Sequence, residues 1–165
     1  MRPVDPRIVE LLNDALTFEL TVTNTYFLHA RMLDNWGLPR LGKVFYYLSI
    51  DEMRDADSLI NRVLMFGGHP NLQRLGPIQV GETPEEMLRL ALASEEAAVG
   101  QFNASAAECH GLGDHGTAAV FEEMVRDEER HADWFESQLD AVARVGVQQY
   151  LSQQVDAGSG PPQAS

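Results

Sequence analysis

The chain has 165 residues, of which 44% are apolar, and its 25 Asp and Glu residues outnumber 12 Lys and Arg residues to give a formal net charge of −13. This size and composition suit one globular domain with a sizeable core, and the acidity argues against binding to nucleic acid or an anionic membrane surface. The single cysteine, Cys109, rules out an intramolecular disulfide and a thiolate metal cluster.

Helix signals dominate the first half of the sequence. Asp5 and Pro6 are typical of an N-cap followed by proline in the first helical turn, and no Gly or Pro interrupts the segment from there to about Asn35. Pro39 opens a second long segment, which ends at the glycine pair 67–68. The sequence therefore predicts two long helices before residue 67.

Two further long helices and a short one are predicted in the second half. Residues 83–86 (Thr-Pro-Glu-Glu) form a capping box with proline in the first turn, and the helix that they open ends near Gly111. The next helix runs from about residue 114 to 144 and stops at Gly146. A short amphipathic segment, residues 147–155, follows it.

One long connection, about residues 68–82, separates the second helix from the third. It is rich in Gly, Pro and Asn, and residues 78–80 are the only candidate strand. Short loops would give an up-down-up-down bundle, whereas a connection of this length lets the third helix run parallel to the second. We therefore predict an all-α four-helix bundle with one long crossover connection and a short fifth helix.

The bundle is expected to occupy residues 1–156, and the Gly-, Ser- and Pro-containing tail, 157–165, has a disordered composition. The first residues lack the apolar core of a signal peptide. No run approaches the roughly 20 apolar residues that a membrane-spanning helix needs. We expect a cytoplasmic protein without membrane attachment.

Each long helix carries an acidic residue near mid-length on the stripe that heptad spacing turns toward the bundle core. An unpaired buried carboxylate costs several kcal/mol or is forced neutral, so a bound cation is the expected compensation. The four acidic residues are Glu19, Glu52, Glu95 and Glu128. The expected core positions around Glu95 are Leu88, Leu92, Val99 and Phe102.

The spacing of these residues is typical of a carboxylate-bound pair of metal ions. Glu52 follows Glu19 by 33 residues, and Glu128 follows Glu95 by 33 residues. Because positions i and i+3 share a helix face, Glu128 and the histidine three residues later can bind one ion. A Glu from each of two helices and a Glu-x-x-His from each of the other two is the di-iron pattern. The matched carboxylates favour a metal site over surface carboxylates at misassigned heptad positions, although a lone Glu-x-x-His is more often a solvated helix face.

Several segments resemble the bacterioferritins, and the resemblance covers about residues 8–155. It implies a ferritin-like bundle, a hollow cage of twenty-four subunits, and a di-iron ferroxidase centre in each bundle that oxidises Fe(II) so that Fe(III) mineral can be stored. The segments are 24–32 (NTYFLHARM), 35–38 (NWGL), 49–53 (SIDEM), 70–73 (PNLQ), 85–89 (EEMLR), 126–134 (RDEERHADW) and 149–151 (QYL). By the motif match, the metal positions are Glu19, Glu52, Asp55, Glu95, Glu128 and His131, and all of these except Asp55 are implied to be catalytic.

Asp55 departs from the family pattern, which has histidine there. Aspartate can bind iron, but it is shorter and negatively charged. Tyr47 and Leu48 stand where many relatives carry the residues of an auxiliary iron site on the inner surface, and only Asp51 remains of that site. The centre is therefore expected to be altered or slow.

Met53 is the family's haem position. It neighbours Glu52 on the second helix and so points about 100° away from the core, toward a second subunit. The resemblance implies haem b shared between two-fold related subunits, with this methionine as an axial ligand from each. From spacing alone, packing of Met53 at an interface is the better explanation, and it is the match over residues 49–53 that favours the haem role.

The leading hypothesis is iron storage in a cage that is homomeric or mixed with a second bacterioferritin subunit. A second hypothesis is a haem-binding subunit with a degraded centre that co-assembles with an active partner. A small di-iron oxidase or peroxidase that builds no cage is a candidate of another class, and a bundle with protonated core carboxylates is the purely structural alternative.

Two further histidines, His110 and His115, flank the loop between the last two long helices. They could line an entry channel for metal, although solvated loop histidines are commoner. His29 lies among aromatic residues of the first helix, and we expect it to be structural.

Overall fold

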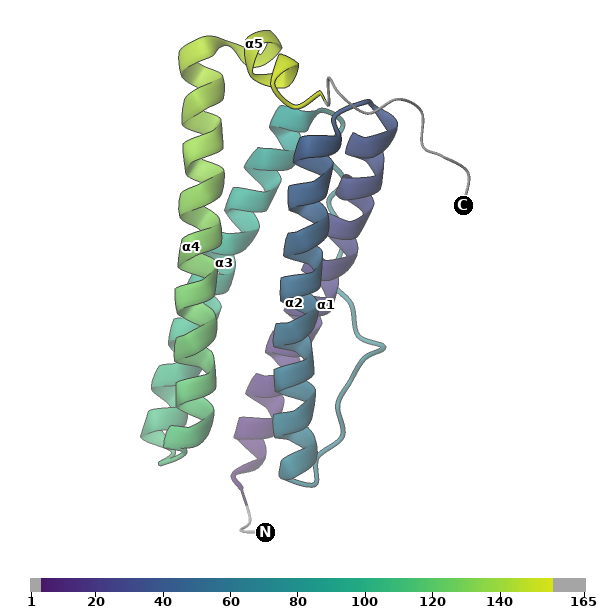
Figure 1. Ribbon diagram of the computed structural model, residues 1–165. Helices are drawn as coiled ribbons and strands as arrows, with labels where there is room; N and C mark the ends of the chain where they lie inside the picture. The colour runs from purple at the N-terminus through teal and green to yellow at the C-terminus, as the bar shows by residue number, and fades with distance from the viewer. Residues whose placement is uncertain (1–3, 156–165) are drawn as a thin grey trace.

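The computed structural model describes residues 4–155, which form four long helices and a short one, with no strand in this range (Figure 1). The predicted all-α architecture is confirmed, and residues 78–80 are irregular. The tail, 157–165, lies outside the described residues. The helices are α1 (Pro6–Asn35), α2 (Pro39–Met65), α3 (Pro84–Gly111), α4 (His115–Val145) and α5 (Val147–Ser152).

Local signals set the ends of the helices as the sequence predicts. The Asp5 side chain accepts a hydrogen bond from the Arg7 amide at 2.9 Å, and the Thr83 hydroxyl accepts one from the Glu86 amide at 3.1 Å. The Glu86 carboxylate returns to the Glu82 amide at 2.8 Å, one residue before the usual partner in a capping box. Gly113, with φ +76°, allows the chain to reverse between α3 and α4.

The bundle consists of two antiparallel hairpins, α1–α2 and α3–α4, joined by the crossover connection (Figure 1). This connection runs back along the length of the first hairpin, so α3 starts at the same end of the bundle as α2 and runs parallel to it. The predicted single-crossover topology is therefore the observed one.

Polar side chains along α1 hold the crossover connection in place. The Asn13 amide group accepts a hydrogen bond from the Asn71 amide, and the Gly76 amide donates to the Thr21 hydroxyl, both at 2.8 Å. Further along, the Gly81 amide donates to Nε2 of the fully buried His29 at 3.0 Å. His29 thus has the structural role expected of it.

The core divides into two apolar clusters, one toward each end of the bundle. On every long helix the buried glutamate lies between residues of the first cluster and residues of the second. One cluster includes Leu12, Leu16, Leu59, Phe102 and Phe121, and the other includes Tyr26, Phe45, Leu88, Met87 and Phe135. The glutamates therefore form a polar layer across the middle of an otherwise apolar core.

The expected core stripe of α3 is wrong at two positions. Leu92 and Val99 are only partly buried, and the buried neighbours of Glu95 are Ala91 and Ala98. The helix is rotated so that its small side chains face inward, because alanines let helices approach closely. Glu95 remains on the buried face after this rotation.

None of the helices within residues 4–155 combines the length and the apolar content that crossing a bilayer requires.

Candidate metal centre

Four glutamates converge at the middle of the bundle, one from each long helix. Glu19 is 0% exposed, and Glu52, Glu95 and Glu128 are each 1% exposed. Helical periodicity alone brings them inward, because each occupies a core position at a similar height along its helix. The sequence prediction that these carboxylates face the core is confirmed.

His131, one turn after Glu128 on α4, faces three of the carboxylates. Its Nδ1 lies 3.3 Å from Glu52 Oε1, 3.4 Å from Glu128 Oε2 and 3.8 Å from Glu95 Oε2. One ligand atom from each of these four residues lies within 4.8 Å of the others. Four of the six predicted metal positions therefore form a compact donor set that a metal ion fits.

The other two predicted positions lie outside this compact set. Glu19 is equally buried, and its carboxylate interacts with Glu52. Asp55 is only partly buried, although the carboxylates of Glu52 and Glu128 influence its pKa. Asp55 therefore lies beside the compact set and is not a member of it.

Several polar atoms of this layer lack hydrogen-bond partners. Both carboxylate oxygens of Glu19 and of Glu128, Glu52 Oε1 and His131 Nδ1 are buried without one. Buried polar groups are nearly always satisfied, and leaving so many unsatisfied in one layer would be costly. A bound cation would accept all of these lone pairs at once.

The protonation equilibria of the layer reflect the same shortage of positive charge. Burial raises the pKa of Glu19 and Glu52 above the usual range, and it raises that of Glu128 to about 8. Burial also raises the pKa of Asp55 to about 7. Burial opposes the charged form of His131, but its contacts with Glu128, Glu52 and Glu95 raise its pKa to about 12. A divalent cation would reverse this, because it favours ionised carboxylates and a neutral imidazole.

Tyr26 is a further member of the layer that the sequence does not assign to it. Its hydroxyl is buried and donates a hydrogen bond to Glu95 Oε1. Burial, together with the nearby carboxylates of Glu95 and Glu52, raises the pKa of this phenol well above its usual range. The available signal was its position seven residues after Glu19, two turns along the same face of α1.

Comparison with known proteins decides the family. The ferritin-like domain model matches residues 9–145. The bacterioferritin of Brucella melitensis is 42% identical over 146 residues, covering 88% of this chain and 91% of the relative. That of Mycolicibacterium paratuberculosis is 40% identical over 158 residues, with coverage of 96% and 98%. That of Rhodobacter capsulatus is 40% identical over 144 residues, with coverage of 87% and 89%.

The chain belongs to the bacterioferritins. This membership supports a function in iron storage, as the resemblance in the sequence led us to expect.

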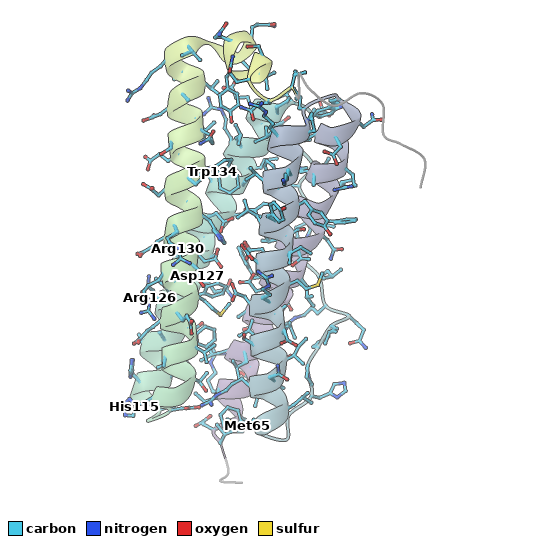
Figure 2. All side chains as sticks on the ribbon, viewed as in Figure 1. Met65, His115, Arg126, Asp127, Arg130 and Trp134 are labelled. Atoms are coloured by element: carbon cyan, nitrogen blue, oxygen red, sulfur yellow. The ribbon has the colours of Figure 1, made fainter. Side chains whose placement is uncertain are left out.

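This bacterioferritin has an opening beside the donor set, between α2 and α4. A cavity of about 200 Å³ is lined by Asp55 and His131 from the centre and by charged residues of the surface. The charged residues pair along their own helices: Arg54 with Asp51 at 2.6 Å on α2, and Arg130 with Asp127 on α4. Asp127 and Arg130, both labelled in Figure 2, lie at mid-height on α4. Asp55 and His131 therefore face this opening from the side of the centre.

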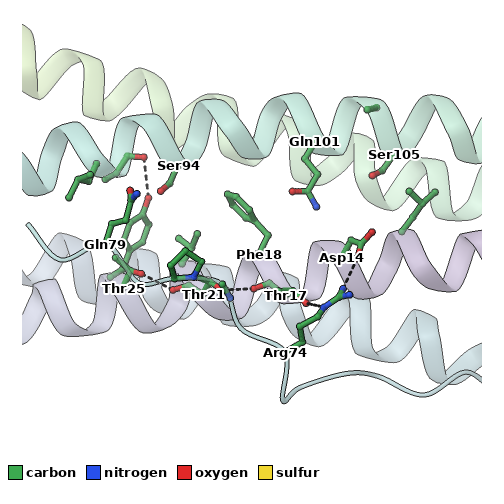
Figure 3. A pocket seen from close by; sticks show the side chains of 18 of the residues that line it. Asp14, Thr17, Phe18, Thr21, Thr25, Arg74, Gln79, Ser94, Gln101 and Ser105 are labelled. Atoms are coloured by element: carbon green, nitrogen blue, oxygen red, sulfur yellow. Dashed lines mark hydrogen bonds and ion pairs between the residues drawn. The ribbon is translucent and has the colours of Figure 1, made fainter.

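A larger cavity, about 650 Å³, lies on the opposite side of the layer, between α1, α3 and the crossover connection (Figure 3). Its middle is lined by small polar side chains such as Thr21 and Ser94, with Phe18 between them. An ion pair at the rim joins Arg74 of the connection to Asp14 at 2.6 Å. Tyr26 lines this cavity, and its hydroxyl donates the hydrogen bond to Glu95 described above.

Met53 lies apart from the donor set, as its place beside Glu52 predicts. It is 50% exposed on α2. Two turns earlier on the same helix, the ring of Tyr46 lies 6.3 Å from that of the half-exposed Phe27 of α1. The outer face of the α1–α2 hairpin therefore presents apolar and thioether groups that the bundle itself does not cover.

Proposed function

We propose that this bacterioferritin subunit is a ferroxidase, which oxidises Fe(II) at the buried layer so that iron is stored as Fe(III). The observation that carries the proposal is the compact donor set of Glu52, Glu95, Glu128 and His131, with unsatisfied lone pairs inside a closed core. Carboxylate and imidazole donors suit iron. Side chains that point inward from four helices of a bundle can hold a pair of such ions.

The Fe(II) ions are substrate in this proposal. They enter through the opening between α2 and α4, where Asp51 and Asp127 are paired with arginines and Asp55 is the remaining carboxylate that faces an arriving cation. The first hairpin would hold the pair with Glu19 and Glu52, and the second would hold it with Glu95 and Glu128. His131 would add a neutral imidazole donor. Each Fe(II) loses one electron, and the two electrons, with two protons, reduce dioxygen to hydrogen peroxide or hydrogen peroxide to two water molecules.

Tyr26 supports the centre as a positioning residue in this scheme. Its hydroxyl holds one oxygen of Glu95 and leaves the other directed toward His131. A carboxylate fixed in this way needs no reorganisation when the ion arrives.

Asp55 supports a second candidate, a haem-binding subunit whose own centre oxidises iron slowly. Four ionised glutamates balance the charge of two divalent ions, and Asp55 would add a further negative charge where the family pattern has a neutral ligand. Its partly exposed position, outside the compact donor set, favours a weakened second metal position.

The exposed methionine supports haem b at a two-fold contact between subunits. Residues of the α1–α2 face fit such a group: the half-exposed Met53 supplies a thioether, and Phe27 supplies an apolar surface. Haem held between two copies of Met53 would supply one-electron transfer between the stored mineral and the outside.

We further propose that the subunits form a multi-subunit cage, which is homomeric or mixed. Residues 1–156 would be the folded unit of each subunit, and the location would be cytoplasmic.

Oxygen-dependent oxidation of Fe(II), followed by absorbance of the ferric product, tests the ferroxidase proposal. We expect Glu128→Ala to slow the oxidation of Fe(II) by at least tenfold, because it removes one of the four residues that form the compact donor set. The exposed Glu123 on the same helix provides the matched control, Glu123→Ala, which should oxidise iron at the wild-type rate. Equal rates for the wild type and Glu128→Ala would refute the proposal.

A further inference from the structure

A second group of metal-binding side chains lies at the turn between α3 and α4. His110 is in the last turn of α3, His115 is the first residue of α4, and Glu122 lies two turns further along α4. His115 lies at the end of the bundle opposite α5 (Figure 2). With 1.5 Å of rise per residue, the turn is about 20 Å from Glu128 along α4, so this group is separate from the carboxylate layer.

The three side chains form one chain of contacts. His110 Nδ1 lies 3.0 Å from His115 Nδ1, and His110 Nε2 lies 2.7 Å from Glu122 Oε1. The two imidazole rings are 5.3 Å apart between centroids and tilted by 52°. The 3.0 Å contact is a hydrogen bond, so one Nδ1 carries a proton and the other accepts it, and a cation bound by both rings would take the place of that proton.

The carboxylate decides which nitrogen of His110 carries its proton. Because a carboxylate only accepts, His110 Nε2 donates to Glu122. In the neutral ring, Nδ1 is then left with a lone pair, which points toward His115. A metal-binding histidine usually has this arrangement, with one nitrogen on the ion and the other donating to a carboxylate.

The turn does not require the histidine pair for its own stability. The Asp114 carboxylate caps α4 by accepting a hydrogen bond from the Thr117 amide at 3.0 Å, and Arg62 binds the same carboxylate at 3.1 Å. Gly113 supplies the positive φ for the reversal. The side chains of His110 and Glu122 are 45% and 48% exposed, so neither fills the core.

We propose that His110 and His115 bind a divalent transition-metal ion, with Glu122 as the positioning residue. Imidazole nitrogens bind zinc at about 2.1 Å, and two nitrogens at that distance in adjacent positions are about 3.0 to 3.4 Å apart. The observed 3.0 Å between the Nδ1 atoms lies within this range. Imidazole donors select zinc, copper, nickel or iron over magnesium and calcium. Water completes the coordination of the ion on the exposed side.

Zinc binding to the full-length protein tests this site, with Zn(II) alone as the probe. Equilibrium dialysis followed by elemental analysis should show one zinc fewer per subunit in the double variant His110→Ala/His115→Ala than in the wild type. The exposed His69 offers a matched control: His69→Ala should retain the wild-type amount of zinc. Glu122→Gln should weaken this zinc about tenfold, because it removes the carboxylate that fixes His110.

Carboxylate and imidazole donors also suit zinc, so the carboxylate layer would bind the same probe, and the comparison is repeated in a Glu128→Ala background. The loss of one zinc on removing the two histidines should persist there, whatever the outcome for iron oxidation. A crystal soaked in zinc should show anomalous scattering about 2.1 Å from both Nδ1 atoms. Equal zinc content in the wild type and the double variant, or no peak between the rings, would overturn the site. An unchanged affinity for zinc in Glu122→Gln would overturn the positioning role of the Glu122 carboxylate.

Discussion

Asp55 is the residue at which the candidate centre differs most from its family pattern. A histidine there would mirror His131 on the opposite hairpin and give each half of the bundle one Glu-x-x-His. The aspartate is instead partly exposed, and it lies at the opening between α2 and α4 rather than within the compact donor set. Its carboxylate is better placed to attract an arriving cation than to hold one between two helices.

The variant Asp55→His should therefore oxidise Fe(II) severalfold faster than the wild type. The imidazole reaches further into the bundle and removes a negative charge that the ion pair does not need. Initial rates under air, with ferric product followed by absorbance, measure the change. Asp57→His places a new histidine on the exposed side of the same helix and should give no gain. A wild-type or slower rate for Asp55→His would show that aspartate is not the weak point.

Single residues also mark the limits of what the sequence could predict. Glu19, Glu52, Glu95 and Glu128 were found because a carboxylate at a core position breaks an otherwise apolar stripe. The hydrogen bond from Tyr26 to Glu95 was not found, because a tyrosine at a core position fits an apolar stripe without any anomaly. Which phenol meets which carboxylate depends on the rotation of α1 against α3, and no local pattern encodes that.

At the scale of the elements, the ends of the helices were predictable because they depend on nearby residues. Pro at the first turn, Thr or Asp at the cap and Gly after the last turn act over three or four positions. The rotation of α3 about its own axis was less predictable. Leu92 and Val99 suit a core as well as Ala91 and Ala98 do, and the choice between them is made by how closely the neighbouring helices approach.

Thr83 gives a direct test of the capping contribution at the start of α3. Its hydroxyl accepts the Glu86 amide, so Thr83→Ala leaves that donor to water and should lower the free energy of unfolding by about 1 kcal/mol. Denaturant titration measures the loss. Thr83→Ser keeps the acceptor and should restore most of the stability, whereas equal losses in both variants would mean that the methyl group, not the cap, matters.

At the scale of the whole molecule, the polar layer couples stability to pH and to metal. Burial raises the pKa of Glu128 from 4.5 to about 8, and it raises those of Glu19 and Glu52 above their usual range. Between pH 4.5 and about 8, the carboxyl group of Glu128 therefore keeps its proton in the folded protein and has lost it in the unfolded chain. Stability conferred by a carboxyl group with a raised folded pKa is present at low pH and falls as pH rises through that window.

The metal-free protein should therefore show a falling melting temperature from about pH 5 to about pH 8. A bound divalent cation needs ionised carboxylates, so saturating zinc should raise the melting temperature and flatten or reverse this trend. Calorimetry across the range, with and without zinc, measures both effects. Glu128→Gln should reduce the slope, while Glu123→Gln, which alters an exposed neighbour, should leave it unchanged. A flat profile without metal would contradict the raised pKa values.

Assembly of subunits can be examined through Met53. Its thioether is half exposed on α2 and has no role inside the bundle. If two copies meet across haem b, Met53→Leu removes both axial sulfur ligands while keeping a side chain of similar volume and apolarity. The haem content per subunit should then fall, or the Soret band should shift strongly.

The same helix supplies the control for that substitution. Met65 is 44% exposed near the end of α2, and Met65→Leu makes the identical chemical change away from the proposed contact. It should keep the wild-type haem content. The assembly mass, measured by light scattering, should be that of a large cage in all three proteins, because leucine preserves the apolar contact between subunits. Haem retained by Met53→Leu with an unshifted Soret band would assign Met53 to interface packing and remove haem ligation from its role.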